Sequence, residues 1–331
     1  MVTTAPAPST IPVGSARPFL HRIDPHGRIL RKLRISLTEA CNFRCVYCMD
    51  PSVVNPVEAD LLPASEIRRI AGILVDGGIE AIRLTGGEPT LRRDFAAIVE
   101  ALADLDIEKG ITTNGQLLSF HAARLAQAGF LSANVSLDSL DPANFRRIAR
   151  GGDLGKVLAG IDSSRKAGIR VKVNCVVQRG WNDHEIEAFH DFSADTGIEV
   201  RFLELMRIGP ARAQHASTHV TSAEIRHRLL DHAGALLPAA VGVDSTVRRW
   251  RTPSGAVLGI MESETLPFCG TCSRLRLSSR GVLHPCLFRE EGVSLLGADP
   301  GQIEDRIRSI VHLKPVDRIL ETPRAMNRIG G

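Results

Sequence analysis

Three closely spaced cysteines are the residues of this chain best suited to chemistry. Cys41, Cys45 and Cys48 occur in the run CNFRCVYC, with the spacing C-x3-C-x2-C. Three thiolates can hold three irons of a cubane cluster and leave the fourth iron without a protein ligand. A catalytic metal site needs such an open position, whereas a structural site closes it. The alternatives are a zinc site or a group of core thiols, but no fourth cysteine or histidine lies nearby to complete a zinc tetrahedron.

A second set of three cysteines lies near the other end of the chain. Cys269, Cys272 and Cys286 have the spacing C-x2-C-x13-C. His284 is two residues from Cys286, and strand residues two apart share a face, so a Cys3His zinc site stays an alternative here. Two sets that each lack one ligand favour two clusters with open irons. Cys175, in the apolar run VKVNCVVQ, is expected to be a buried core thiol.

The first triad, with Tyr47 just before its last cysteine, resembles the radical S-adenosylmethionine (SAM) superfamily. The run GGEP at Gly86–Pro89 supports the resemblance. It implies that SAM binds the open iron through its amino and carboxylate groups. It also implies that one electron cleaves the sulfonium, and that the resulting 5′-deoxyadenosyl radical abstracts a hydrogen atom. Glycines without side chains let the GGEP backbone approach a ligand closely.

Together, both triads resemble one family within that superfamily, the GTP 3′,8-cyclases, which begin molybdenum cofactor biosynthesis. The resemblance runs from about His26 to the C-terminus. Its motifs are LRISLTEACNFRCVYCM, IRLTGGEPTLRRDF, TTNG, NVSLDSLD, VKVNCVVQRGWND, RFLELM, the second triad with its Arg-x-Arg, and the final Gly330-Gly331. GGEP alone indicates only the superfamily, whereas its combination with the second triad and the Gly-Gly end is specific.

The resemblance implies the site residues. SAM is expected to contact Tyr47, Gly87, Ser136 and Met206. GTP is expected to contact Arg34, Arg83, Thr112, Lys172, Arg274, Leu275 and Arg276, with its guanine at the open iron of the second cluster. Among these residues Arg34, Arg274 and Arg276 are also expected to be catalytic. Some relatives carry a lysine two residues before the strand arginine, where this chain has Ala81.

The arginines also have a physical argument of their own. A triphosphate needs several fixed cations, and the planar guanidinium suits phosphate oxygens. Arg34, Arg83 and Arg201 occur inside otherwise apolar strand-like runs. A buried cation without a partner is costly, so an anionic ligand would explain all three.

The Gly-Gly end is expected to reach the active site, because that is its role in the family. We therefore predict that extending the chain beyond Gly331, or the change Gly330→Ala, lowers activity while both clusters remain bound. Full turnover by an extended chain would contradict this prediction.

Short apolar strands alternate with helix-length amphipathic segments from Arg31 to Met206. The expected strands are Leu33–Leu37, Ala81–Thr85, Gly110–Thr113, Ser132–Leu137, Arg170–Val177 and Val200–Leu205. Glycines end the helices before the strands, and Pro63, Asp94 and Asn182 are helix-start signals. Six βα units in series predict an α/β fold, a partial (β/α)6 TIM-like barrel with its chemistry at the carboxyl ends of the strands.

The pattern changes after Ser222. A helix around Ala223–Leu230 and a hairpin formed by Thr246–Trp250 and Ala256–Met261 precede the second triad. We expect a C-terminal α+β extension that closes the barrel mouth. The expected divisions are a disordered leader at 1–25, a radical SAM barrel at 26–221, and a C-terminal domain at 222–331 with the second Fe-S cluster and the Gly-Gly tail.

Composition limits the remaining function classes. The 331 residues carry a net charge of +4, with the basic residues spread among acids, so nucleic acid is not implied. The sequence has no run of eighteen or more apolar residues, so no membrane span is expected. The first twenty residues lack the apolar core of a signal peptide. Cysteines in ligand spacing suit a reducing cytoplasm.

The sequence analysis therefore predicts a cytoplasmic lyase with two [4Fe-4S] clusters that cyclises GTP with SAM. The resemblance also implies a homodimer, a low-potential electron donor, and cyclic pyranopterin monophosphate synthase as the downstream partner. One alternative is a radical SAM enzyme that modifies a peptide or another small molecule, although such relatives carry seven further cysteines rather than three. Another is an electron-transfer or zinc-binding module, which would carry four ligands per site and would not need GGEP or buried arginines.

Overall fold

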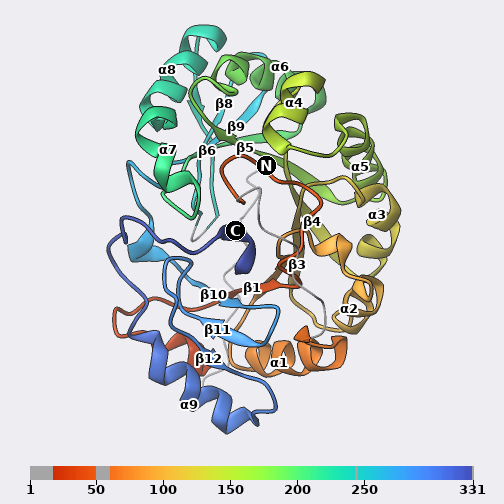
Figure 1. The fold of residues 1–331 in the computed structure, drawn as a ribbon, viewed down its shortest axis with the longest axis vertical. Helices are drawn as coiled ribbons and strands as arrows, with labels where there is room; N and C mark the ends of the chain where they lie inside the picture. The colour runs from red at the N-terminus through yellow and green to blue at the C-terminus, as the bar shows by residue number, and fades with distance from the viewer. Residues whose placement is uncertain (1–17, 50–59, 243–244, 330–331) are drawn as a thin grey trace, which may run out of the picture.

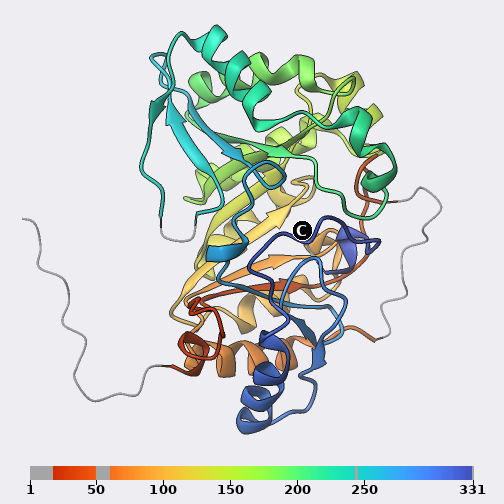
Figure 2. The ribbon, with the colours of Figure 1, turned by 90° about the vertical axis from the view of Figure 1, so that its left-hand side faces the viewer.

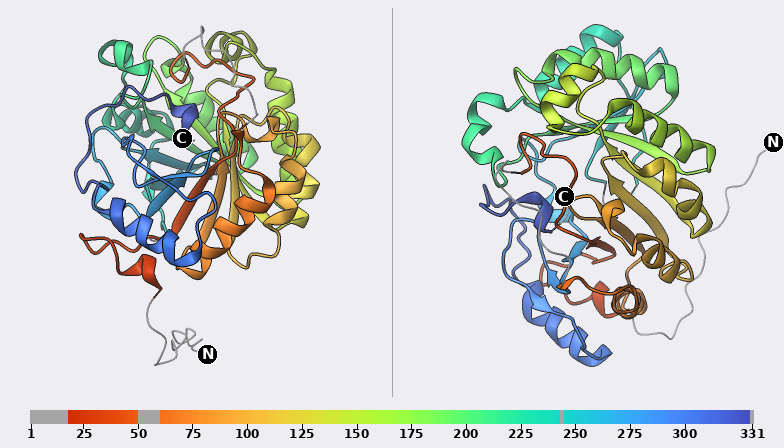
Figure 3. Two further views of the ribbon diagram at one scale, coloured as in Figure 1. Left: turned by 60° about the horizontal axis from the view of Figure 1, so that its bottom comes forward. Right: turned by 45° about the vertical axis from the view of Figure 1, so that its right-hand side comes forward.

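A single twelve-stranded sheet forms the centre of the molecule, in a computed structural model that describes residues 18–49, 60–242 and 245–329. The strand order is β12-β11-β10-β1-β2-β3-β4-β5-β6-β9-β8-β7. The strands are β1 (Lys32–Ser36), β2 (Ala81–Thr85), β3 (Glu108–Thr113), β4 (Phe130–Ser136), β5 (Arg170–Val177), β6 (Glu199–Glu204), β7 (Leu237–Pro238), β8 (Arg248–Arg251), β9 (Val257–Met261), β10 (Arg274–Leu277), β11 (Val282–His284) and β12 (Val293–Ser294). The sheet is curved, and most helices lie along its outer side (Figures 1 and 3).

The helices follow the strands in the order expected for βα units. They are α1 (Ala64–Asp76), α2 (Phe95–Ala101), α3 (Leu118–Gln127), α4 (Pro142–Ala149), α5 (Leu154–Lys166), α6 (Ile186–Thr196), α7 (Ala211–Thr218), α8 (Ser222–Ala233) and α9 (Pro300–Val311). Short 3-10 turns are η1 (Phe19–His21), η3 (Pro89–Leu91), η4 (Asp183–Glu185), η5 (Cys269–Thr271) and η6 (Met326–Arg328). None of the described helices is long and apolar enough to cross a bilayer.

All six predicted strands are confirmed, with ends that differ by at most two residues. The three predicted helix-start signals are confirmed. Pro63 and Asp94 are the N-caps of α1 and α2, and Asn182 is the N-cap of η4. Gly197 closes α6 with a φ of 69°, the left-handed conformation that glycine adopts at no steric cost.

The C-terminal part extends the sheet at both edges. β9 pairs parallel with β6, and β10 pairs parallel with β1. The predicted hairpin is confirmed as the antiparallel pair β8 and β9, and β10 and β11 form a second antiparallel pair. The sequence analysis expected this region to lie across the barrel mouth. Its strands cover the edges of β1 and β6, whose backbone N–H and C=O groups need partners.

The two faces of the sheet differ in chemistry. On β1, Leu33 and Ile35 are buried in the outer face toward the helices. Lys32, Arg34 and Ser36 alternate with them and lie on the inner face, because successive strand residues point to opposite sides. Each fully buried aliphatic side chain on the outer face stabilises the fold by about 1.5–3 kcal/mol. The inner face is polar and is where a ligand site is expected.

Residues 18–25, which the sequence analysis placed in a disordered leader, pack against the sheet domain. Leu20 is fully buried and its amide donates to the Gly77 carbonyl at 3.0 Å. Asp24 forms a buried ion pair with Arg28 at 2.9 Å. The leader boundary at residue 25 was therefore wrong, because Leu20 finds partners that are distant in sequence and Asp24 pairs with a nearby arginine that is itself buried. The rest of the predicted leader lies outside the described residues.

Candidate active site

The loop that carries the first triad begins at the carboxyl end of β1 and is held by the GGEP loop. The Gly87 amide donates to the Thr38 carbonyl at 2.7 Å, and the Glu88 amide donates to the Ala40 carbonyl at 2.8 Å. A Cβ atom on Gly87 would lie 2.3 Å from the Ala40 carbonyl oxygen. The glycines therefore let the two backbones meet, a structural role beyond the ligand approach predicted for them.

Glu88 joins the loops that follow three neighbouring strands. It is fully buried, and its Oε1 accepts from the hydroxyls of Thr90 at 2.6 Å and Thr113 at 2.8 Å. Its Oε2 accepts from the Asn114 amide at 2.7 Å. Burial raises the pKa of this carboxyl, and the hydrogen bonds from Thr90, Asn114 and Thr113 oppose the rise. Asn114 Nδ2 in turn lies 4.0 Å from Cys41 Sγ, so this network reaches the triad.

Tyr47 ties the same loop to β4 and β5. Its hydroxyl donates to Asp138 Oδ2 at 2.7 Å, and Asp138 Oδ1 accepts from the Val176 amide at 2.8 Å. Burial raises the pKa of Asp138 to about 6. Tyr47 was predicted only as a SAM contact, and Asp138, within the motif NVSLDSLD, was not predicted as a site residue. A buried tyrosine hydroxyl needs a partner, which is the signal that could have found Asp138.

The second triad lies at the opposite end of the sheet. Cys269 and Cys272 precede β10, and Ser273 accepts hydrogen bonds from the amides of Arg31 and Lys32 at the start of β1. Cys286 follows β11, which runs antiparallel to β10 and returns to the same end. The prediction that the chemistry gathers at the carboxyl ends therefore fails for this triad. The five residues of β1 separate the two ends by roughly 17 Å, at about 3.3 Å per residue.

The sulfur positions test whether zinc or a larger cluster fits the triads. Sulfurs around one zinc lie about 3.8 Å apart, because Zn–S bonds are about 2.3 Å in a tetrahedron. Among described residues, only His190, Asp191 and His232 bring three metal-binding donor atoms within 4.8 Å of one another. Both triads are wider than that, with or without His284. The wide spacing fits a multi-iron cluster better than a single zinc ion.

His284 makes other contacts. Its Nδ1 lies 3.0 Å from the Glu291 carbonyl, and its Nε2 lies 3.2 Å from an Arg324 nitrogen. Burial and then Arg324 lower its pKa to about 4. This ring is engaged with the polypeptide rather than with the three sulfurs, which weakens the Cys3His alternative.

Three arginines form a row on the inner face between the two ends. Arg276 of β10, Arg34 of β1 and Arg83 of β2 are register neighbours. Within the described chain, Arg34 has no hydrogen bond or ion pair. Burial, followed by repulsion from Arg276, Arg274 and Arg83, lowers the pKa of Arg34 well below its usual value. An uncompensated cation in this position is expected where an anion binds.

Arg83 is positioned by a strand glycine. Its guanidinium donates to the Ile111 carbonyl at 3.0 Å and to Ser132 Oγ at 3.2 Å. A Cβ on Gly110 would lie 2.3 Å from Ser132 Oγ and 3.0 Å from the Arg83 guanidinium. Gly110 thus leaves the space in which the arginine crosses the sheet. Burial lowers the pKa of Arg83 to about 10.

Further polar groups on the inner face lack partners. Among the described residues, the buried oxygens Ser36 Oγ, Thr112 Oγ1 and Asn174 Oδ1 have no hydrogen-bond partner. Lys172, level with Thr112 across β4, likewise has no hydrogen bond or ion pair there. Burial and then Arg201 lower its pKa to about 8. Orphaned polar atoms beside unpaired cations fit a polar, anionic ligand.

Two predicted residues differ from expectation. Arg201 was expected to need an anionic ligand, but its Nε donates to Glu199 Oε1 at 2.5 Å, so its charge already has a partner. Leu275 was placed in the GTP set, but its side chain is fully buried in the apolar core, on the face opposite Arg274 and Arg276. Only its backbone can face a ligand. Cys175 is buried in the same core, as predicted.

The residues predicted for SAM follow different strands at the same end as the first triad. Tyr47 and Gly87 come after β1 and β2, Ser136 ends β4, and Met206 follows β6. The C-terminal segment crosses this end of the sheet (Figures 1 and 2). The Gly209 amide donates to the Thr322 carbonyl at 3.0 Å, and Asn327 Nδ2 donates to the Glu39 carbonyl at 2.9 Å. Gly330 and Gly331 lie outside the described residues.

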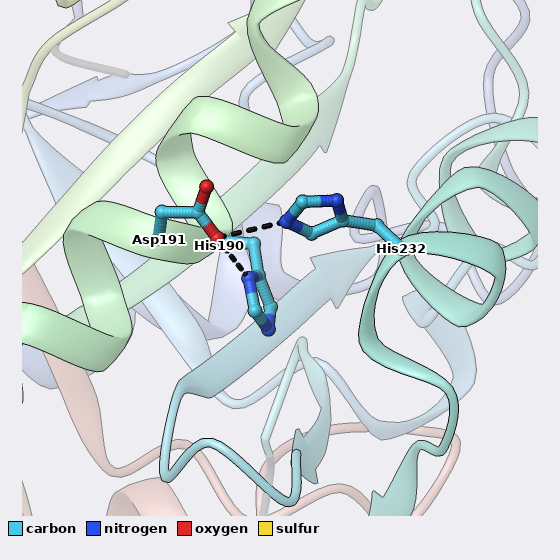
Figure 4. Close-up of side chains that lie close together, drawn as sticks. All are labelled: His190, Asp191 and His232. Atoms are coloured by element: carbon cyan, nitrogen blue, oxygen red, sulfur yellow. Dashed lines mark hydrogen bonds and ion pairs between the residues drawn. The ribbon is translucent and has the colours of Figure 1, made fainter.

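The cluster of His190, Asp191 and His232 is a separate feature on α6 and α8 (Figure 4). Asp191 Oδ1 lies 2.8 Å from His190 Nδ1 and 2.8 Å from His232 Nε2. One carboxylate oxygen that accepts from both rings explains this arrangement without an ion. The cluster joins two outer helices and is not part of the inner face.

Comparisons with known proteins agree with this geometry. Residues 35–193 match the sequence profile of the Radical SAM superfamily, and residues 198–317 match that of Molybdenum Cofactor Synthesis C. A protein from Synechocystis sp., named GTP 3′,8-cyclase, is 38% identical over 310 residues, which cover 93% of this chain and 94% of the relative. The chain belongs to the GTP 3′,8-cyclase family. A relative of the same name from Acidothermus cellulolyticus is 42% identical over 283 residues, covering 82% of this chain and 78% of its own.

Solved structures support the fold. SuiB of Streptococcus suis, in its crystal structure bound to the precursor peptide SuiA, aligns with a TM-score of 0.64 at 16% identity. The alignment covers 88% of this chain and 67% of SuiB. This likeness concerns the mixed α/β fold with its large parallel sheet. The family membership expected from the motifs is confirmed, and the radical SAM superfamily implies a [4Fe-4S] cluster and SAM.

Proposed function

We propose that this protein is a GTP 3′,8-cyclase, which converts GTP into (8S)-3′,8-cyclo-7,8-dihydroguanosine 5′-triphosphate in the first step of molybdenum cofactor biosynthesis. One observation carries the proposal beyond the family relationship. An inner face with an unpaired arginine and orphaned hydroxyl and amide oxygens lies between two cysteine triads at opposite ends of the same strands. A triphosphate with a polar base and ribose matches that lining.

Cys41, Cys45 and Cys48 would hold the first cluster. When bound there, the cluster and SAM supply the radical that removes a hydrogen atom. Tyr47, Gly87, Ser136 and Met206 would hold SAM at this end. The hydroxyl of Tyr47 is already bonded to Asp138, so its ring face and backbone are the parts left for SAM.

Cys269, Cys272 and Cys286 would hold a second cluster, and its open iron would take the guanine. Arg34, Arg83, Arg276 and Lys172 are the cations of the inner face that would hold the triphosphate, together with Arg274 at the cluster end and Thr112 as a hydroxyl donor. Their contribution is position: fixing the ribose and the base keeps C3′ beside C8, which replaces a search over conformations by a single bound geometry.

We also propose that Gly330 and Gly331 reach this site. The described segment before them supports the proposal, because Asn327 fixes it beside the loop of the first triad and Ile329 is fully buried. The curved sheet would correspond to the partial (β/α)6 barrel, with the extension closing its open side. A homodimer, a low-potential electron donor, cyclic pyranopterin monophosphate synthase as the next enzyme, and a cytoplasmic location belong to the same proposal.

The test is anaerobic reconstitution followed by incubation with SAM, dithionite and GTP, with products identified by mass spectrometry. We expect 5′-deoxyadenosine together with a cyclised isomer of GTP. Deoxyadenosine with unchanged GTP would keep the superfamily chemistry and contradict the substrate. If protein with about eight irons per chain (two four-iron clusters) forms neither of the two products, the catalytic proposal is contradicted.

A further inference from the structure

Lys314 is a fully buried lysine that contacts a ligand of the second triad. It follows α9, and only 1% of it is exposed. Its Nζ donates to Cys272 Sγ at 3.2 Å, to the Arg274 carbonyl at 2.7 Å and to the Pro285 carbonyl at 3.0 Å. No motif of the sequence analysis included this residue, since HLKP has no periodic or ligand-like spacing.

The three contacts indicate that Lys314 carries a charge. An ammonium has three N–H donors, whereas a neutral amine has two, and three acceptors surround Nζ. Among the described residues, no carboxylate forms an ion pair with Lys314. A buried cation is costly without a negative partner, and the sulfur of Cys272 is the acceptor here that becomes an anion as a metal ligand.

A second buried cation fixes the backbone around Lys314. Arg28 donates to the Lys314 carbonyl at 2.8 Å and to the Pro315 carbonyl at 2.6 Å. It also donates to the Cys269 carbonyl at 3.0 Å and pairs with Asp24. The segment before β1, the end of α9 and the second triad are therefore held together by fixed hydrogen bonds. This rigidity sets where the ammonium lies relative to Cys272.

We propose that Lys314 is a positioning residue that raises the reduction potential of the second cluster through its charge-assisted hydrogen bond to Cys272. The inference rests on the second cluster of the proposed function. A hydrogen bond and a positive charge at a ligand sulfur stabilise the more negative, reduced cluster, and both are known determinants of cluster potential. Arg28 supports this role by holding the lysine in place.

Lys109 provides a matched control. It is also buried, and its Nζ donates to three carbonyls, those of Leu102, Ala103 and Leu105. It lies on the outer side of β3 and touches neither triad. Lys109→Met therefore removes a buried ammonium and its carbonyl contacts without removing a contact to sulfur.

The experiment is a redox titration of the reconstituted holoenzyme followed by EPR, in the unmodified protein, Lys314→Met and Lys109→Met. We expect the potential of the second cluster to shift to more negative values only in Lys314→Met, while the first cluster keeps its potential. Cys272→Ser and Cys45→Ser variants assign the two EPR signals. If Lys314→Met holds about eight irons per chain and the reduction potential of its second cluster is unchanged, the inference is overturned.

A measurement on the unmodified protein decides the case even if Lys314→Met loses its second cluster. The unmodified protein is labelled with ¹⁵N-lysine, and its reduced second cluster is studied by electron–nuclear double resonance. We expect a coupling between the cluster and a lysine nitrogen, and we expect the same coupling in Lys109→Met. Absence of that coupling would overturn the inference. Four irons in the unmodified protein would instead overturn the second cluster of the proposed function, and this inference with it.

Discussion

The two triads have opposite surroundings. At the first triad, burial, followed by the neighbouring thiol of Cys41 and the carboxylate of Asp138, raises the pKa of Cys48 to about 12. At the second triad, burial also acts to raise the pKa of Cys272, but the cations of Arg274 and Lys314 outweigh it and lower the value to about 5. Cys48 therefore lies beside an acidic group, whereas Cys272 lies beside two cations.

This difference shows how one inner face can serve two ligands. A zwitterionic and cationic molecule such as SAM suits the end near Asp138, whereas a triphosphate suits the row of arginines that begins beside the second triad. The backbone contacts differ too. Glycines and Glu88 hold the first triad from neighbouring strand ends, whereas long cationic side chains from distant segments hold the second.

The largest effect is expected from removing one cysteine of each triad. Cys45→Ser and Cys272→Ser should each lower the iron content by about half, from eight to four per chain. Cys45→Ser should abolish 5′-deoxyadenosine, whereas Cys272→Ser should still form it and lose the cyclised product. Iron analysis and mass spectrometry measure both. Equal loss of deoxyadenosine in the two variants would break the division of roles between the ends.

Arg34→Met should weaken GTP binding by about 10- to 100-fold, the value of a charge-assisted hydrogen bond of roughly 1.5–3 kcal/mol. SAM binding should not change. Without GTP the variant should unfold at a higher urea concentration than the unmodified protein, because a buried cation repelled by Arg276 and Arg83 is removed. Arg165→Met, an exposed change on α5, is the control for both measurements. Unchanged GTP affinity would contradict the assignment of Arg34.

GTP binding should depend on the charge of Lys172. Its pKa is lowered to about 8, so the free protein loses this cation as the pH rises through that value. The dissociation constant for GTP should therefore rise roughly tenfold between pH 7 and pH 9, because one charge-assisted hydrogen bond to GTP is lost. Isothermal titration calorimetry measures it. Lys172→Arg should flatten the profile, since a guanidinium stays charged, and the same slope in that variant would contradict the prediction.

The smallest effect is expected from Tyr47→Phe. It removes the donor to Asp138 and should cost about 1–2 kcal/mol, measured as a lower urea midpoint and faster iron loss from the first cluster. The second cluster should keep its iron at the unmodified rate. Equal loss from both clusters would show that the ends are not independent.

The strands of the central sheet could be predicted because each has its own local signals. Apolar alternation and glycine after each helix place β1 to β6 within two residues. The cysteine triads were found from spacing alone, because ligand chemistry fixes the spacing within a short loop. The direction in which the side chain of Leu275 points, away from Arg274 and Arg276, also follows from the strand period.

Long-range pairing could not be predicted. Nothing local shows that β9 and β10 join opposite edges of the sheet, and this pairing carries the second triad to the amino ends of the strands. The ion pair of Arg201 with Glu199 is different, because two residues that are two apart on one strand share a face, and this local spacing was present in the sequence. Lys314 and Arg28 belong to no motif, since Lys314 meets Cys272 across 42 residues and Arg28 meets Lys314 across 286.

The late position of β9 and β10 affects how this protein folds during synthesis. β1 leaves the ribosome early, yet its outer edge has no partner until Arg274–Leu277 emerges, more than 230 residues later. β6 waits for a much shorter stretch of chain, until Val257–Met261 emerges. Contacts of such sequence separation slow folding, and an open strand edge invites pairing with other chains. The nascent chain thus exposes the open edge of β1 for most of its synthesis, which makes chaperone binding to the incomplete sheet an expected requirement for high yield.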